Sequence, residues 1–137
     1  MESPMGKVLP RMTPQEYTDA ALRMERTPDY IAGPGGHQLA RIDHASKGLV
    51  TEAGELTDAL KRVLIYGKPL DRTNVLEEIG DILWYAALGL DAIGASFEDA
   101  FESNIAKLRV RYPDQFDPAR ALTRDVEAER AALERPR

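Results

Sequence analysis

The chain has 137 residues, of which 43% are hydrophobic and 30% charged, as expected for one globular domain with its own core. It contains no cysteine, which excludes disulfides, zinc–thiolate sites, iron–sulfur clusters and thiol nucleophiles. The net charge of −5 argues against a nucleic-acid polymer as partner, and the lack of any apolar run near ~20 residues argues against a membrane.

The first predicted helix begins after Thr13 and has the sequence of a capped start. Pro14 follows at the first turn and Glu16 lies three residues after Thr13, which is the spacing of a capping box. We expect this helix to end near Thr27-Pro28. The glycines and proline of residues 33–36 cannot continue a helix and predict a flexible loop.

The second predicted helix is long, because an apolar periodicity runs from about residue 38 to residue 66. It stops at the Gly-Lys-Pro of residues 67–69, and a glycine followed by a proline is a common helix end. A kink or break is an alternative near Ser46 and Gly48, since both are weak helix formers.

Two further helices follow with their own start signals. Asn74 and Glu77 form a weaker capping box for the third helix, which we expect to end at a glycine. Ser96 and Asp99 cap the fourth, which runs up to the Tyr-Pro pair at 112–113.

Together these elements predict an all-α protein, with four main helices in a bundle and no competing strand pattern. We expect a single domain over 1–137, with a core at about 13–116 and a charged, peripheral tail at 119–137 that is either helical or partly disordered. Four glycines lie inside the predicted helices and indicate either close helix packing or room for a ligand: Gly48, Gly54, Gly80 and Gly89.

Carboxylates recur at one spacing, with Glu52 and Glu55 on the second helix and Glu78 and Asp81 on the third. Residues three apart share a helix face, and both pairs lie within apolar stripes, so antiparallel packing would face four carboxylates across one seam. Such a seam calls for divalent cations, and all-oxygen ligands suit Mg²⁺, with Mn²⁺ as a substitute. Either pair alone could be a solvated acidic face. A di-iron bundle is a weaker alternative, because it needs histidines where Glu55 and Asp81 stand.

Polar residues on the fourth helix form a candidate phosphate-binding group. Asn104, Lys107 and Arg111 share one face, and Tyr112 follows directly. An amide can donate to a phosphate oxygen, a lysine supplies a point charge and an arginine can bind bidentately. The alternative is a solvated basic face near a helix C-terminus, where cations oppose the helix dipole.

The acidic pairs resemble a family motif. Glu-x-x-Glu, 22 intervening residues and Glu-x-x-Asp resemble the motif of the MazG-like all-α nucleoside triphosphate pyrophosphohydrolases. The stretch of residues 104–113 is similar to the following helix of that family, so the resemblance covers about residues 39–116. Thr51 departs from the pattern, since many members carry another glutamate there.

The resemblance implies hydrolysis of a (deoxy)nucleoside triphosphate to the monophosphate and pyrophosphate, with Mg²⁺ or Mn²⁺ held by the four carboxylates. It also implies that Glu52 and Glu55 are catalytic, with Glu55 the preferred water-orienting group, and that the fourth-helix residues stabilise the leaving phosphates. We further expect a homodimer or homotetramer in the cytoplasm of a bacterium or of a phage-infected host.

The sequence indicates the base-binding residues less clearly than the metal ligands. Aromatic and imidazole side chains near the acidic pairs could contact a base, although core packing is the alternative for each: His44, Trp84 and Tyr85, and also Tyr17 and His37. The compact chain resembles phage-type members, which favours dGTP or GTP, and dUTP or dCTP stay open. A non-catalytic helical assembly or partner-binding module that retains a degenerate metal site is the other alternative.

Overall fold

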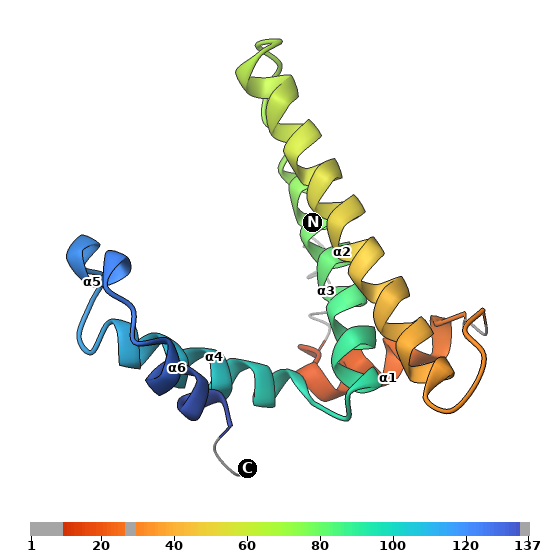
Figure 1. Cartoon of the computed structure of the whole chain (residues 1–137). Helices are drawn as coiled ribbons and strands as arrows, with labels where there is room; N and C mark the ends of the chain where they lie inside the picture. The colour runs from red at the N-terminus through yellow and green to blue at the C-terminus, as the bar shows by residue number, and fades with distance from the viewer. Residues whose placement is uncertain (1–9, 27–29, 135–137) are drawn as a thin grey trace.

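The computed structural model describes residues 10–26 and 30–134, and within these ranges the chain forms helices and loops without a strand. The predicted all-α class is therefore confirmed. The helices of the described ranges are drawn in Figure 1: α1 Pro14–Met24, α2 Gly36–Leu64, α3 Arg72–Ala92, α4 Phe97–Arg111, α5 Pro118–Leu122 and α6 Val126–Leu133. None of them is both long and apolar enough to span a membrane.

Two of the three predicted helix starts are confirmed in detail. The Thr13 hydroxyl accepts from the Glu16 backbone N–H, and the Glu16 carboxylate accepts from the Thr13 backbone N–H at 2.7 Å. Ser96 and Asp99 make the same reciprocal pair. The predicted start of the third helix is wrong.

Helix α3 begins at Arg72, because the carboxylate of Asp71 accepts from the Asn74 backbone N–H at 3.0 Å. The cap is thus an aspartate three positions before the predicted cap, Asn74, and the Asn74 side chain is left for another partner. The first helix also ends earlier than predicted, at Met24, and Thr27-Pro28 falls outside the described residues.

Helices α2 and α3 form a long antiparallel hairpin (Figure 1). Helix α2 is continuous from Gly36 to Leu64, so the alternative of a break near Gly48 is wrong. A Cβ built on Gly48 would lie 2.2 Å from the Tyr85 ring of α3, so at this position only a glycine lets the two helices approach as they do. Gly67, with φ 61°, ends the hairpin arm.

The base of the hairpin holds the core. Helix α1 crosses it there, and Ala21 of α1, Ala87 of α3 and Phe97 of α4 are buried together. Partly buried Tyr17 and Trp84 pack on the same cluster. Because this core sits at one end, the far half of the hairpin projects beyond it (Figure 1).

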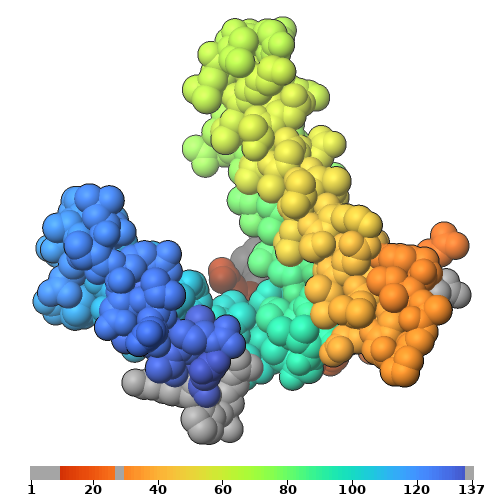
Figure 2. Space-filling view, in the orientation of Figure 1, coloured from red at the N-terminus to blue at the C-terminus, as the bar shows by residue number. Residues whose placement is uncertain are grey.

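Helix α4 leads away from the hairpin, and α6 packs against it (Figure 1). In the space-filling view the α4–α6 arm and the hairpin arm diverge and leave open space between them (Figure 2). Up to residue 134, where the described part of the chain ends, the predicted tail contains two short helices, α5 and α6. A single chain therefore leaves the bundle open on the side of α4.

Candidate active site

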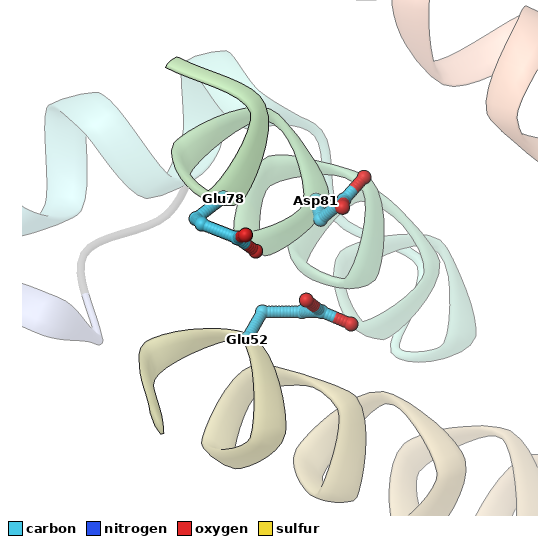
Figure 3. A group of neighbouring side chains, drawn as sticks. All are labelled: Glu52, Glu78 and Asp81. Carbon is cyan, nitrogen blue, oxygen red and sulfur yellow. The ribbon is translucent and has the colours of Figure 1, made fainter. Parts of the chain in front are cut away.

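The hairpin brings three of the four predicted metal ligands together. Glu52 projects from α2, and Glu78 and Asp81 project from the facing side of α3 (Figure 3). One carboxylate oxygen of each lies within 4.8 Å of the others. Glu78 and Asp81 meet because they lie three apart on one helix, and Glu52 reaches them because α2 and α3 are antiparallel.

Glu55 lies beside this acidic cluster rather than in it. It is exposed, and it lines a polar hollow of about 270 Å³ together with Glu78. One helical turn thus separates a carboxylate inside the cluster, Glu52, from a carboxylate at its solvent edge. Glu55 is therefore open to solvent and lies outside the group of three carboxylates.

The cluster carries unbalanced negative charge. Burial raises the pKa of the Glu52 carboxyl, and the charges of Asp81, Glu78 and Glu55 raise it further. Glu78 is 9% exposed, and its Oε1 accepts one hydrogen bond, from Asn74 Nδ2 at 2.8 Å. The amide orients this carboxylate without neutralising it.

A divalent cation fits this set of groups. The donors are all carboxylate oxygens, which Mg²⁺ and Mn²⁺ prefer. Two oxygens on one Mg²⁺ are at most about 4 Å apart, at bonds of about 2 Å, so the 4.8 Å spread closes with small side-chain rotations. A bound cation would also balance the negative charges of Glu78 and Asp81 beside Glu52.

Tyr17 of α1 supports the α3 side of the cluster. Its hydroxyl donates to the carbonyl oxygen of Gly80 at 3.2 Å, one residue before Asp81. Burial raises the pKa of the Tyr17 phenol, and the negative charge of Asp81 adds to the rise. The sequence predicts Tyr17 as a possible base contact, but its hydroxyl is bonded to the backbone next to Asp81.

Three of the five predicted base contacts, His44, Trp84 and Tyr85, form a ring cluster. Tyr85 meets His44 edge to face, with ring centroids 5.6 Å apart, and it meets Trp84 at 5.0 Å. The Nδ1 atom of His44 is buried and has no hydrogen-bond partner among the described residues. His44 lies eight residues before Glu52 on α2, about 12 Å along the helix axis.

The predicted phosphate-binding residues lie on the diverging arm. Asn104 is exposed and Lys107 is half-buried, both on α4. Arg111 is already paired, since its Nε and Nη2 donate to the two carboxylate oxygens of Glu129 on α6 at 2.8 and 3.0 Å. The Arg111 guanidinium also lies 5.7 Å from the centre of the Tyr112 ring. One chain does not bring this group to the acidic cluster.

Asn74 and Arg62 were not among the sequence-based candidates. The sequence predicts Asn74 only as a helix cap, but its position four residues before Glu78, on the same face of α3, is the signal for the contact between them. Arg62 lies near the end of α2 and lines the hollow that also contains Glu55 and Glu78. Arg62 lies seven residues, about two helical turns, after Glu55, and this same-face spacing is the signal that could have identified it.

The fold and the cluster define an all-α protein with a candidate site for divalent cations. A family model, the MazG nucleotide pyrophosphohydrolase domain, matches residues 42–116, which is more than half of the chain. The chain belongs to this family, and the resemblance seen in the sequence is confirmed. Searches of curated proteins and of solved structures gave no significant match. The class of activity is therefore that of the nucleoside triphosphate pyrophosphohydrolases.

Proposed function

We propose that this protein hydrolyses a (deoxy)nucleoside triphosphate to the monophosphate and pyrophosphate, in the cytoplasm and with Mg²⁺ or Mn²⁺. The observation that carries the proposal is the cluster of Glu52, Glu78 and Asp81 within a MazG domain. We take residues 1–137 as one such domain, with the carboxylates in its core segment of 13–116.

The chain's own groups divide the chemistry between them. Glu52, Glu78 and Asp81, with Glu55 at the edge, would hold the cations, which when bound neutralise phosphate charge and lower the pKa of water. The Glu55 carboxylate orients the attacking water and accepts its proton. The water oxygen bonds to the α-phosphorus, the bond from that phosphorus to the α,β-bridging oxygen breaks, and pyrophosphate leaves with the electron pair.

We also propose a homo-oligomer, a dimer or a tetramer, in which a second copy fills the open side of the bundle. Apolar side chains face solvent along α3 and α4 of one chain: Leu76, Ile79, Leu83, Phe101 and Ile105. Leu76 is 71% exposed. A stripe of this kind is typical of a surface that another chain covers. In such an assembly Asn104, Lys107, Arg111 and Tyr112 would contact the phosphates bound at the partner's carboxylates.

For the base we propose the ring cluster of His44, Trp84 and Tyr85, with dGTP or GTP as the preferred substrate. The positions of Trp84 and Tyr85 support this assignment, because they follow Asp81 by three and four residues and so lie on the same side of α3. The alternative preferences are dUTP and dCTP.

The test is pyrophosphate release from the eight common nucleoside and deoxynucleoside triphosphates, with Mg²⁺ or Mn²⁺. We expect release from a subset led by guanine nucleotides, and loss of release on addition of EDTA. If pyrimidine nucleotides gave the fastest pyrophosphate release, only the base assignment would be wrong. No release from any nucleotide would contradict the enzyme and favour a non-catalytic helical module.

A further inference from the structure

The outer half of the hairpin carries two adjoining hollows. The inner one, about 270 Å³, contains Glu55 and Glu78, and the outer one, about 370 Å³, extends to the turn after α2. They share a wall made by Ala59, Arg62, Asp71 and Asn74. A groove therefore runs from the acidic cluster towards the tip of the hairpin, and Asn74, bonded to Glu78, marks the inner end of the shared wall.

Among the described residues, Arg62 is the positively charged side chain that lines both hollows. Lys68 lines the outer hollow alone. The inner hollow is otherwise strongly acidic, with carboxylates from both helices: Glu55, Asp58, Asp71, Glu77 and Glu78. Helical side chains lean towards the N-terminus of their helix, so the Arg62 side chain extends back towards the carboxylates. Its Nη2 lies 3.4 Å from Asp58 Oδ2, one helical turn beyond Glu55.

The Arg62–Asp58 pair is open to exchange. The Arg62 side chain is 68% exposed, and an exposed pair of this kind contributes little to stability. Two oxygens of a phosphate offer the guanidinium a bidentate, charge-assisted contact, and the divalent cations that the site would hold would offset the carboxylates that line the inner hollow. Arg111, by contrast, is held by the buried carboxylate of Glu129.

The position of the groove also indicates which way a nucleotide would lie along the hairpin. Along α2 the ring cluster at His44 lies on one side of Glu52, and Arg62 lies on the other. A nucleotide whose α-phosphorus lies at the acidic cluster would place its base at the rings and its β- and γ-phosphates in the groove. The leaving pyrophosphate gains negative charge as its bond breaks, and a cation there favours the step.

We infer that Arg62 binds the β- and γ-phosphates of the substrate and the departing pyrophosphate, in the groove between the acidic cluster and the hairpin tip. This rests on the proposed function and deepens it. Arg62 contributes to the same chain's site that holds Glu52, Glu78 and Asp81, with no residue of a second copy required for this contact. Lys68 adds positive charge at the outer end of the groove.

The test is direct binding by titration calorimetry in the presence of Mg²⁺. Three ligands are compared on the full chain: inorganic pyrophosphate, an α,β-imido nucleoside triphosphate and the matching monophosphate. We expect Arg62→Ala to weaken the first two by about 10-fold or more and to leave the monophosphate unchanged within about 2-fold. Arg62→Lys keeps the positive charge but loses the planar guanidinium, so its affinities for these two ligands should lie between those of wild type and Arg62→Ala.

Lys61→Ala is the matched control, because Lys61 is exposed on the same helix, has the same charge and does not line either hollow. Equal weakening by Lys61→Ala and Arg62→Ala would overturn the inference, since bulk charge would then explain the effect. Unchanged pyrophosphate affinity in Arg62→Ala would overturn it as well, as would a wild-type chain that binds no pyrophosphate.

The two proposals fail in different ways. Wild-type protein that binds pyrophosphate through Arg62 but releases none from any nucleotide would contradict the proposed function and keep the binding site. If wild-type protein releases pyrophosphate and kcat/KM of Arg62→Ala is within about 2-fold of the wild-type value, the proposed role of Arg62 is wrong and the proposed function stands.

Discussion

At the scale of single residues, Asp81 shows how the clustered carboxylates of the site lower the stability of the metal-free protein. Its carboxylate lies with Glu52 and Glu78, and its negative charge adds to the rise that burial causes in the pKa of both Glu52 and Tyr17. These groups repel one another in the metal-free chain, so part of the folding free energy is lost to this contact. A bound divalent cation reverses the sign of the effect, because it stabilises the folded state alone.

We therefore expect Asp81→Asn to raise the metal-free Tm by a few degrees and to abolish hydrolysis. Wild-type Tm should rise on addition of millimolar Mg²⁺ or Mn²⁺, and the variant should lose most of that rise. Thermal denaturation with and without metal measures both, with Glu102→Gln, an exposed carboxylate on α4, as the control. A metal-induced rise in Asp81→Asn equal to that of wild type would contradict the assignment of Asp81 as a ligand.

Glu129 is the residue whose charge state supports the α4–α6 arm. Its side chain is 3% exposed and accepts from Arg111 and Arg124. The hydrogen bonds from Arg111 and then from Arg124 lower the pKa of Glu129 from its ordinary 4.5 to about 2. Because the folded-state pKa is depressed, the stabilisation is complete above about pH 4.5 and is lost as the pH falls towards 2.

We expect chemical denaturation to show a decline in unfolding free energy from about pH 5 to pH 2 in the wild type. The decline should be smaller in Glu129→Gln, which has no proton to gain, and this difference isolates Glu129 from other carboxylates. An identical pH profile in the two proteins would contradict the role of this pair.

At the scale of elements, two glycines in α2 have opposite surroundings. Gly48 faces the Tyr85 ring, where a built Cβ would lie at 2.2 Å, and Gly54 has nothing within 4 Å of a built Cβ. Both lie inside a continuous helix, where glycine is a weaker helix former than alanine. The sequence alone could not separate packing from open space at these positions, since that depends on which residue of α3 lies opposite.

We expect Gly48→Ala to destabilise the protein by about 1–3 kcal/mol, because the ring of Tyr85 must shift in a close-packed contact. Gly54→Ala should instead stabilise it by up to about 1 kcal/mol, through helix propensity alone. Urea denaturation of the two variants beside wild type measures both values. A stabilising Gly48→Ala would show that the helices do not approach at Gly48 as described.

At the scale of the whole molecule, the divergence of α4 from the hairpin leaves apolar surface uncovered. Ile105 on α4 and Leu76 on α3 are exposed in one chain, on the two helices that border the open space of Figure 2. A second copy seated there would bury these side chains and would bring an α4 helix to a neighbouring acidic cluster.

Ile105→Asp should therefore dissociate the proposed oligomer, because it places a charge in an apolar interface. Light scattering after size exclusion should report a smaller assembly than for wild type, and the Tm should lose its dependence on protein concentration. Leu122→Asp, at an exposed position on α5, is the control. A wild-type chain that is monomeric at all concentrations would contradict the proposed assembly.

Much of the fold could be predicted because it depends on neighbours along the chain. Thr13 with Glu16 and Ser96 with Asp99 form caps from side chains three residues apart, and their contacts need nothing distant. The i, i+3 spacing of Glu78 and Asp81 likewise places both on one helix face whatever surrounds them. The same local pattern, repeated on two helices, was enough to indicate the family.

Only the tertiary structure decided which of these groups meet. The spacing of Glu52 and Glu55 was the same as that of Glu78 and Asp81, yet the offset between the antiparallel helices puts Glu52 in the cluster and Glu55 at its edge. Arg111 matched a phosphate-binding pattern, and the fold paired it with Glu129, which is 18 residues away. Helix periodicity specifies a face but not the partner of that face, because the partner is chosen by packing such as that of Gly48 on Tyr85.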